Sequence, residues 1–136
     1  MSFLTLKEIE SKVSEVAKKI NAPEIYLPTY GFSEDGARPH IEVTNYGYYF
    51  VVVERGKEYE RRLTFDFKEL LYWIFKGVVS EMAGHWEVHH RNENEDSRRQ
   101  MFAKEIQLIS KIDVEFGKRL QLEIDEILRR NPFVDK

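Results

Sequence analysis

The feature that most restricts the fold of this chain is an uninterrupted apolar run from Tyr48 to Val53. Both alternating faces of the run are apolar, which is typical of a central strand covered on each side. Asn45 to Gly47 precedes it and favours a hairpin turn, because Asn and Gly tolerate positive φ. Arg55 to Lys57 supplies a second tight connection. The run therefore predicts the middle strand of a small sheet.

The neighbouring segments supply two partners for this strand. His40 to Val43 is a short predicted strand, and Glu58 to Phe65 is charged over most of its length, as expected of an edge strand with one wet face. Strands joined by such short turns pair in antiparallel fashion. Glu24 to Thr29 is also expected to be extended, because Pro23 and Pro28 favour that backbone.

Helical periodicity occupies the rest of the chain. Thr5 and Glu8 form a capping-box signature ahead of a first helix that ends near Asn21. Three later helices each begin at an aspartate: Asp66, Asp96 and Asp113. The predicted fold is therefore α+β, with an N-terminal helix, a three-stranded antiparallel meander, then three helices packed over the sheet, in a single domain over residues 1–136.

Composition excludes several classes of function. The 136 residues include no cysteine, which rules out disulfides, thiolate nucleophiles and cysteine-ligated zinc. The net charge of -3 argues against direct nucleic-acid binding. No apolar stretch is long enough for a membrane span, and the first ten residues lack the features of a secretory signal. We expect a cytoplasmic protein without a cofactor; its oligomeric state is left open.

One cluster suggests a metal site. His85 and His89 lie four residues apart, so on a helix their rings could share a zinc ion with a carboxylate from residues 93–96. The zincin pattern, however, requires Glu directly after the first His, and Trp86 stands there. The sequence favours an ordinary polar helix end, and no metal ligands are assigned. A metal-binding hydrolase or regulator is the alternative function.

A second set of charged residues is interpreted as a structural polar network that pins two helices and the sheet together. Its members are Glu54, Arg55, Glu87, Arg91, Asp96, Arg98 and Arg99. Catalysis by paired carboxylates would need a cleft and separated pKa values, which the sequence does not indicate. Phosphate-binding glycine loops and nucleophile elbows are also missing from the sequence. No catalytic residues are predicted.

Tyrosines and carboxylates gather in residues 30–36 and around the 45–49 turn. Exposed Tyr is typical of protein-binding patches, because it buries much area at low entropic cost. The predicted partner-binding residues, which include two carboxylates before the third helix, are Tyr30, Glu34, Asp35, Tyr46, Glu93 and Glu95. Self-association of the aromatic patch, in a purely structural module, is a third interpretation.

Several stretches form a wider ordered pattern. They are Ile20–Pro23, Arg38–Val43, Tyr48–Gly56, Leu70–Phe75, the series Glu87, Arg91, Asp96, Arg98, Arg99 and Phe102, and finally Asn131–Phe133. In these stretches the chain resembles the bacterial immunity protein 63 family of polymorphic toxin systems. Glu105 and Ile106 depart from the Gln and Leu expected there.

The resemblance implies a small protein that binds and neutralises a cognate toxin domain by stoichiometric inhibition, without catalysis. It also implies that partner specificity lies on exposed loops such as residues 33–36 and 91–95. If that toxin is a nuclease with a basic active site, carboxylates on these loops would steer association.

Overall fold

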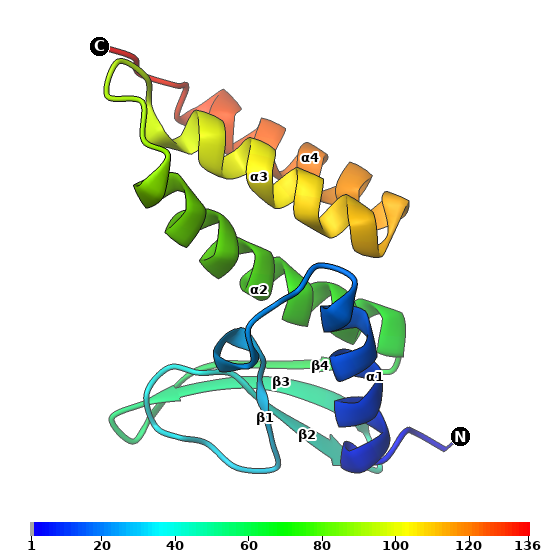
Figure 1. Cartoon of the computed structure of the whole chain (residues 1–136). Coiled ribbons are helices and arrows are strands. Elements are labelled where there is room, and N and C mark those ends of the chain that lie inside the picture. The colour runs from blue at the N-terminus through cyan, green and yellow to red at the C-terminus, as the bar shows by residue number, and fades with distance from the viewer. Residues whose placement is uncertain (1) are drawn as a thin grey trace. The chain divides into compact units, whose positions relative to one another are not determined.

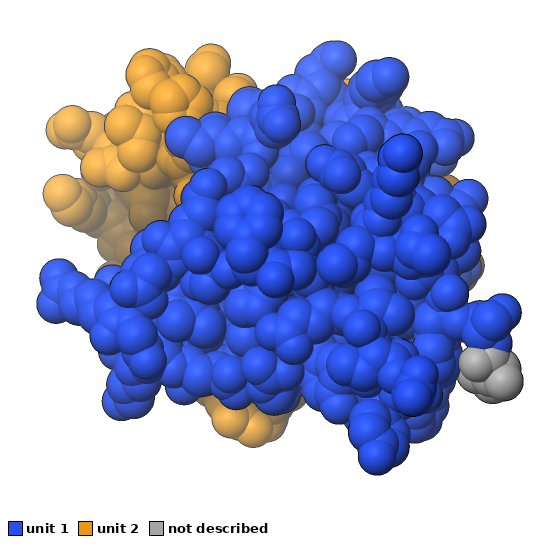
Figure 2. Space-filling view, turned by 90° about the horizontal axis from the view of Figure 1, so that it is seen from below, with its two compact units in different colours: residues 1–75 blue, residues 76–136 orange. Residues whose placement is uncertain are grey.

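The computed structural model describes residues 2–136, and it has the predicted α+β class (Figure 1). The elements are α1 (Leu6–Lys18), the 3₁₀ turn η1 (Glu24–Tyr26), β1 (Thr29–Tyr30), β2 (His40–Thr44), β3 (Gly47–Glu54), β4 (Lys57–Thr64), α2 (Phe67–His89), α3 (Ser97–Ile112) and α4 (Val114–Arg130). The chain divides into two compact units, unit 1 up to Phe75 and unit 2 from Lys76 (blue and orange in Figure 2). The expectation that residues 1–136 form a single domain stays a prediction.

Unit 1 contains a four-stranded sheet in the order β1-β2-β3-β4. As predicted, β3 is central: it pairs antiparallel with β2 and with β4, so that Phe50 lies opposite both Ile41 and Arg62. The prediction of three strands is wrong, because the two-residue β1 adds to β2 in parallel, with Thr29 opposite His40. The sheet is therefore mixed rather than a pure antiparallel meander.

The segment that leads into β1 explains this error. Residues 24–26 form a 3₁₀ turn instead of the predicted extended chain, and the Leu27 amide donates to the Glu24 carbonyl (2.9 Å). The chain then becomes extended, and the Gly31 amide donates to the Ile41 carbonyl (2.8 Å). This pairing joins residues that are distant in sequence, and local periodicity carries no signal for it.

The first helix begins as predicted. Thr5 Oγ1 accepts a hydrogen bond from the Glu8 amide (3.1 Å), and the Glu8 carboxylate accepts one from the Thr5 amide (3.0 Å). Ile9, Val13 and Ala17 are buried, and their four-residue spacing places them on one face of α1. The helix contacts β1 and β2. Its buried face thus covers the newly added edge of the sheet.

Aromatic side chains join the sheet to the first turns of α2 within unit 1. The rings of Tyr48 and Phe67 meet edge to face at 5.8 Å, and those of Phe50 and Trp73 at 6.5 Å. Tyr48 is buried, and its hydroxyl accepts a hydrogen bond from the Leu4 amide (2.8 Å). Tyr48 therefore belongs to the core rather than to the exposed aromatic surface.

In unit 2, α3 and α4 lie side by side, joined through Asp113 (Figure 1). The Asp113 carboxylate caps α4 by accepting a hydrogen bond from the Glu115 amide (2.7 Å). A Cβ at Gly117 would collide with the Ser110 side chain, so glycine permits the close approach of these two helices. Within residues 2–136, no helix has the length and apolarity needed to cross a membrane.

Candidate functional site

A cleft of about 760 Å³ lies in unit 1, between α1 and the chain from Glu24 to Arg38. Its α1 wall includes Glu10, Ser14 and Lys18, and the opposite wall includes Tyr30 and Phe32. The four-residue spacing of the α1 members places them on one side of the helix, beside its buried stripe. The fold thus holds a concave surface in place.

Arg38 braces the wall opposite α1. Its Nε donates to the Leu27 carbonyl (2.7 Å), its Nη2 to the Glu24 carbonyl (3.0 Å) and its Nη1 to the Glu34 carboxylate (3.3 Å). A guanidinium suits this task, because its N–H groups point outward in a fixed planar fork. The charge of Arg38 is therefore already engaged within the protein.

Tyr30 is a half-buried phenol in the cleft. Burial raises the pKa of Tyr30 to about 12; the nearby carboxylates of Glu10 and Glu24 add to the rise, and Arg38 opposes it. Tyr30 consequently stays neutral at physiological pH. Phe32 is 60% exposed beside it, so the cleft also presents an aromatic surface to solvent.

The other predicted partner-binding residues of unit 1 lie outside this lining. Asp35 has a left-handed backbone (φ 59°), and its carboxylate accepts a hydrogen bond from the Gly56 amide (2.6 Å). Asp35 therefore ties its loop to the β3–β4 turn. Tyr46 is 71% exposed in the β2–β3 turn. Of the predicted set, the structure brings Tyr30 and Glu34 together in the cleft.

Glu93 and Glu95 lie in unit 2, exposed on the segment between α2 and α3. The C-terminal residues hold this segment. The Lys136 amide donates to the Asn94 carbonyl (3.1 Å), and the Asp96 amide donates to the Asp135 carboxylate (2.9 Å). The two acidic side chains thus lie on a fastened loop and are not among the residues that line the cleft.

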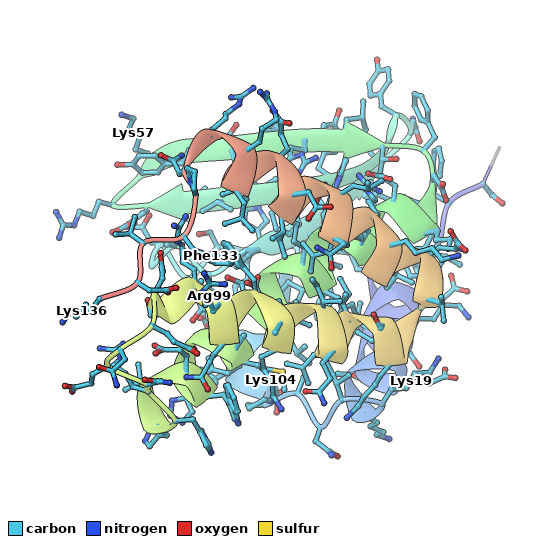
Figure 3. The ribbon with its side chains drawn as sticks, turned by 90° about the horizontal axis from the view of Figure 1, so that it is seen from above. Lys19, Lys57, Arg99, Lys104, Phe133 and Lys136 are labelled. Carbon is cyan, nitrogen blue, oxygen red and sulfur yellow. The ribbon has the colours of Figure 1, made fainter. Side chains whose placement is uncertain are left out.

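Asp96, Arg98 and Arg99 grip residues 131–136, an arrangement that we call the tail clamp. The Asp96 carboxylate accepts a hydrogen bond from the Val134 amide (2.9 Å), and Arg98 Nη2 donates one to the Pro132 carbonyl (2.9 Å). The Arg99 guanidinium pairs with Asp135 (2.9 Å) and lies 4.2 Å from the centre of the Phe133 ring (Figure 3). Hydrogen bonds, chiefly from the Arg98 side chain, hold the pKa of Asp96 well below its usual range.

The predicted polar network falls into two groups. Besides the tail clamp, unit 2 contains Glu87, which is 4% exposed and forms a bidentate pair with Arg91 (2.8 and 3.0 Å). This pair lowers the pKa of Glu87. Glu54 and Arg55 belong to unit 1, where the backbone of Glu54 forms an isolated antiparallel β-bridge with that of Gly36. The described hydrogen bonds thus fasten the tail in one unit and a loop in the other.

Sequence analysis missed a charged cluster on the sheet. Glu42 on β2 binds Arg61 on β4 (3.1 Å), and Arg61 also binds Glu58 (2.8 Å). Buried His40 reaches Glu42 through Nε2 (2.7 Å). Hydrogen bonding from Arg61 is the main cause that lowers the pKa of Glu42. The two-residue spacing of His40 and Glu42, which puts them on one face of a strand, was the available signal.

The structure places the two histidines of the predicted pair beside each other at the end of α2. The rings of His85 and His89 lie 4.6 Å apart, but Nδ1 of His89 already bonds to the carbonyl of His85 (2.9 Å). Among residues 2–136, no group of three or more His, Cys, Asp or Glu is placed to hold a metal ion. The alternative of a metal-binding hydrolase or regulator would need a third ligand beside the two histidines, and the described residues do not supply one.

Comparison with known families places part of the chain in a described family. The family model described as Immunity protein 63 matches residues 44–126, more than half of the chain, from the end of β2 into α4. No curated protein and no solved structure matches the chain. The cleft is lined by residues 10–38, which precede the matched range.

Proposed function

This chain belongs to the immunity protein 63 family, and we propose that it binds and neutralises a cognate toxin domain through a stoichiometric protein–protein complex. The family membership carries the proposal, because an immunity protein protects its producer from a toxin. The expected complex buries about 800 Å² on each partner, with a few aromatic or charged side chains supplying most of the affinity.

The cleft in unit 1 supports this proposal as a preformed recognition surface. It combines the exposed Phe32 ring, the half-buried Tyr30 and acidic side chains on a wall that Arg38 braces. A surface that is already held in its binding shape loses less conformational entropy on association than a flexible loop would. We therefore assign the main contact with the toxin to the cleft, and a subsidiary contact to Tyr46.

We further propose that the chain inhibits without catalysing any reaction and that it acts in the cytoplasm of the producing cell. In this proposal the tail clamp and the Glu87–Arg91 pair are structural. Their side chains form hydrogen bonds with partners within the chain, and we assign none of them to a substrate.

The decisive experiment co-expresses this chain with the product of the adjacent open reading frame. We expect growth to be restored only when both are present, and the purified mixture to elute as a complex of fixed stoichiometry in light scattering. The control is a toxin from an unrelated system, which the chain should not neutralise. Failure to form a complex with the neighbouring product, or turnover of that product's substrate by the chain alone, would overturn the proposal.

A further inference from the structure

The charges around the cleft are unequally engaged. Arg38 and Glu34 pair with each other (3.3 Å), and Arg38 also serves two main-chain carbonyls. The side chains of Glu10 and Glu24, in contrast, have no hydrogen-bond or ion-pair partner among residues 2–136. Two carboxylates therefore face the same cleft with their charges unmatched within the described chain.

These two carboxylates converge on Tyr30. Both are close enough to influence the titration of its hydroxyl, although they come from α1 and η1. Lys18 is the other basic side chain of the lining, eight residues beyond Glu10. At 1.5 Å of rise per residue, this spacing separates them by about 12 Å along the helix. Arg38 also lies near Tyr30, but it pairs with Glu34 (3.3 Å), so the unpaired charges at this end of the cleft are the acidic ones.

The cleft also offers aromatic surface at this end. Phe32 is 60% exposed, and Tyr30 is half-buried with a neutral hydroxyl. A guanidinium group fits such surroundings, because it donates in-plane hydrogen bonds to carboxylates while its face stacks on aromatic rings. A neutral or acidic side chain would leave both carboxylates unmatched. The cavity, the rings and the free charges thus point to one class of occupant.

We propose that the cleft receives an arginine side chain of the cognate toxin, held by Glu10 and Glu24 and packed against Tyr30 and Phe32. This inference rests on the proposed function and deepens it, because it names the surface and the chemical group that the surface recognises. Exposed hydrophobic area at Phe32 supplies the apolar part of the contact. The paired charges of Arg38 and Glu34 keep the shape of the cleft and do not bind the partner.

The test uses the variant E10Q/E24Q, which keeps the size of both side chains and removes their charges. The matched control is E15Q, because Glu15 is an exposed glutamate of α1 outside the cleft lining. Against the toxin encoded by the adjacent reading frame, we expect E10Q/E24Q to weaken binding by about tenfold or more and E15Q by less than about twofold. Thermal melts of all three proteins verify that they are folded.

A second arm uses a defined probe. The full chain is titrated with the blocked tripeptide acetyl-Gly-Arg-Gly-amide, and with acetyl-Gly-Gln-Gly-amide as control, while backbone amide resonances are followed by NMR. We expect saturable shifts of the Tyr30 and Phe32 amides with the arginyl peptide only. In E10Q/E24Q these shifts should disappear, and in E15Q they should remain.

The outcomes separate the two proposals. If the wild-type chain binds the toxin and E10Q/E24Q binds it equally well, the arginine assignment is overturned while the immunity function stands. If the wild-type chain does not bind the toxin, the proposed function fails, and the peptide titration still decides whether the cleft accepts a guanidinium. Equal shifts with the glutaminyl peptide, or saturable shifts that persist in E10Q/E24Q, would also overturn the assignment.

Discussion

The carboxylates of the cleft and those of the tail clamp differ in whether they have partners within the described chain. In the tail clamp, Asp96 and Asp135 accept hydrogen bonds from main-chain amides and from arginines, and their pKa values are lowered as a result. In the cleft, Glu10 and Glu24 have no such partners within the described chain. Charges that are satisfied internally stabilise the fold, whereas unmatched charges in a concave surface are available to a ligand. The difference separates structural carboxylates from recognition carboxylates.

Reversing the charges in each region is the strongest test of this difference. We expect E10K/E24K to lower the affinity for the toxin by about a hundredfold or more, because like charges at an interface cost several kcal/mol. The parallel variant E93K/E95K, on the segment next to the tail clamp, should change it by less than about threefold, as a peripheral charge does. Calorimetric titration of both variants measures this, and a larger loss in E93K/E95K would transfer the binding surface to unit 2.

Unit 2 also contains a carboxylate that is buried, in contrast to those of the cleft and the tail clamp. Glu105 on α3 is 6% exposed, and burial raises its pKa to about 7, with Lys76 opposing in part. The wild-type chain therefore has the full stabilising contribution of protonated Glu105 below pH 4.5, and loses it as the pH rises through about 7.

Glutamine at this position mimics the protonated form. We expect E105Q to raise the free energy of unfolding by about 2 kcal/mol at pH 8 and by little at pH 4.5. Urea denaturation at both pH values provides the measurement. An equal gain at the two pH values would show that packing, rather than ionisation, sets the effect.

A third prediction concerns the brace of the cleft. R38A leaves the Leu27 carbonyl without the Arg38 donor and removes one of the two donors of the Glu24 carbonyl, so we expect a loss of about 1.5 kcal/mol in the free energy of unfolding. R130A is the control, because Arg130 is 71% exposed in its ion pair with Glu126 and should contribute little. Urea denaturation compares the two. A loss in R130A that matched the loss in R38A would remove the special role of the brace.

The smallest effect is expected at the exposed end of the tail clamp. Arg99 and Asp135 are 42% and 40% exposed, and their pair lowers the pKa of Asp135. Its contribution is present above the unfolded pKa of aspartate and is lost as the pH falls through the lowered folded value. D135N should reduce the melting temperature slightly at pH 7, and the difference from wild type should shrink as the pH falls into the acid range. A difference that grew in acid would contradict this assignment.

The sequence predicts those parts of the molecule that depend on neighbours along the chain. The capping box of Thr5 and Glu8, the central strand β3 and the cap at Asp113 all arise from residues within a few positions of each other. These features have characteristic spacings, and they were placed correctly together with the α+β class. The resemblance noted in the sequence is confirmed by the family match over residues 44–126.

Features that depend on distant residues were not predicted. The pairing of β1 with β2, the grip of Arg38 on the Leu27 carbonyl and the bond from Val134 to Asp96 join positions far apart in sequence. Such contacts follow from the way the chain folds back, for which a periodic pattern gives no sign. Tyr30 and Glu34 were therefore proposed for their chemistry, while the cleft that contains them became visible only in the structure.

Arg38 secures the outer wall of the cleft largely through peptide carbonyls, which every amino acid possesses. The outward side chains of that wall, such as Ile25 and Phe32, take no part in the anchorage. Replacing these side chains would keep the fold of the wall and change the chemistry of its exposed surface. This protein is consequently a natural starting point for a randomised library, in which new inhibitory specificities are selected on an unchanged frame.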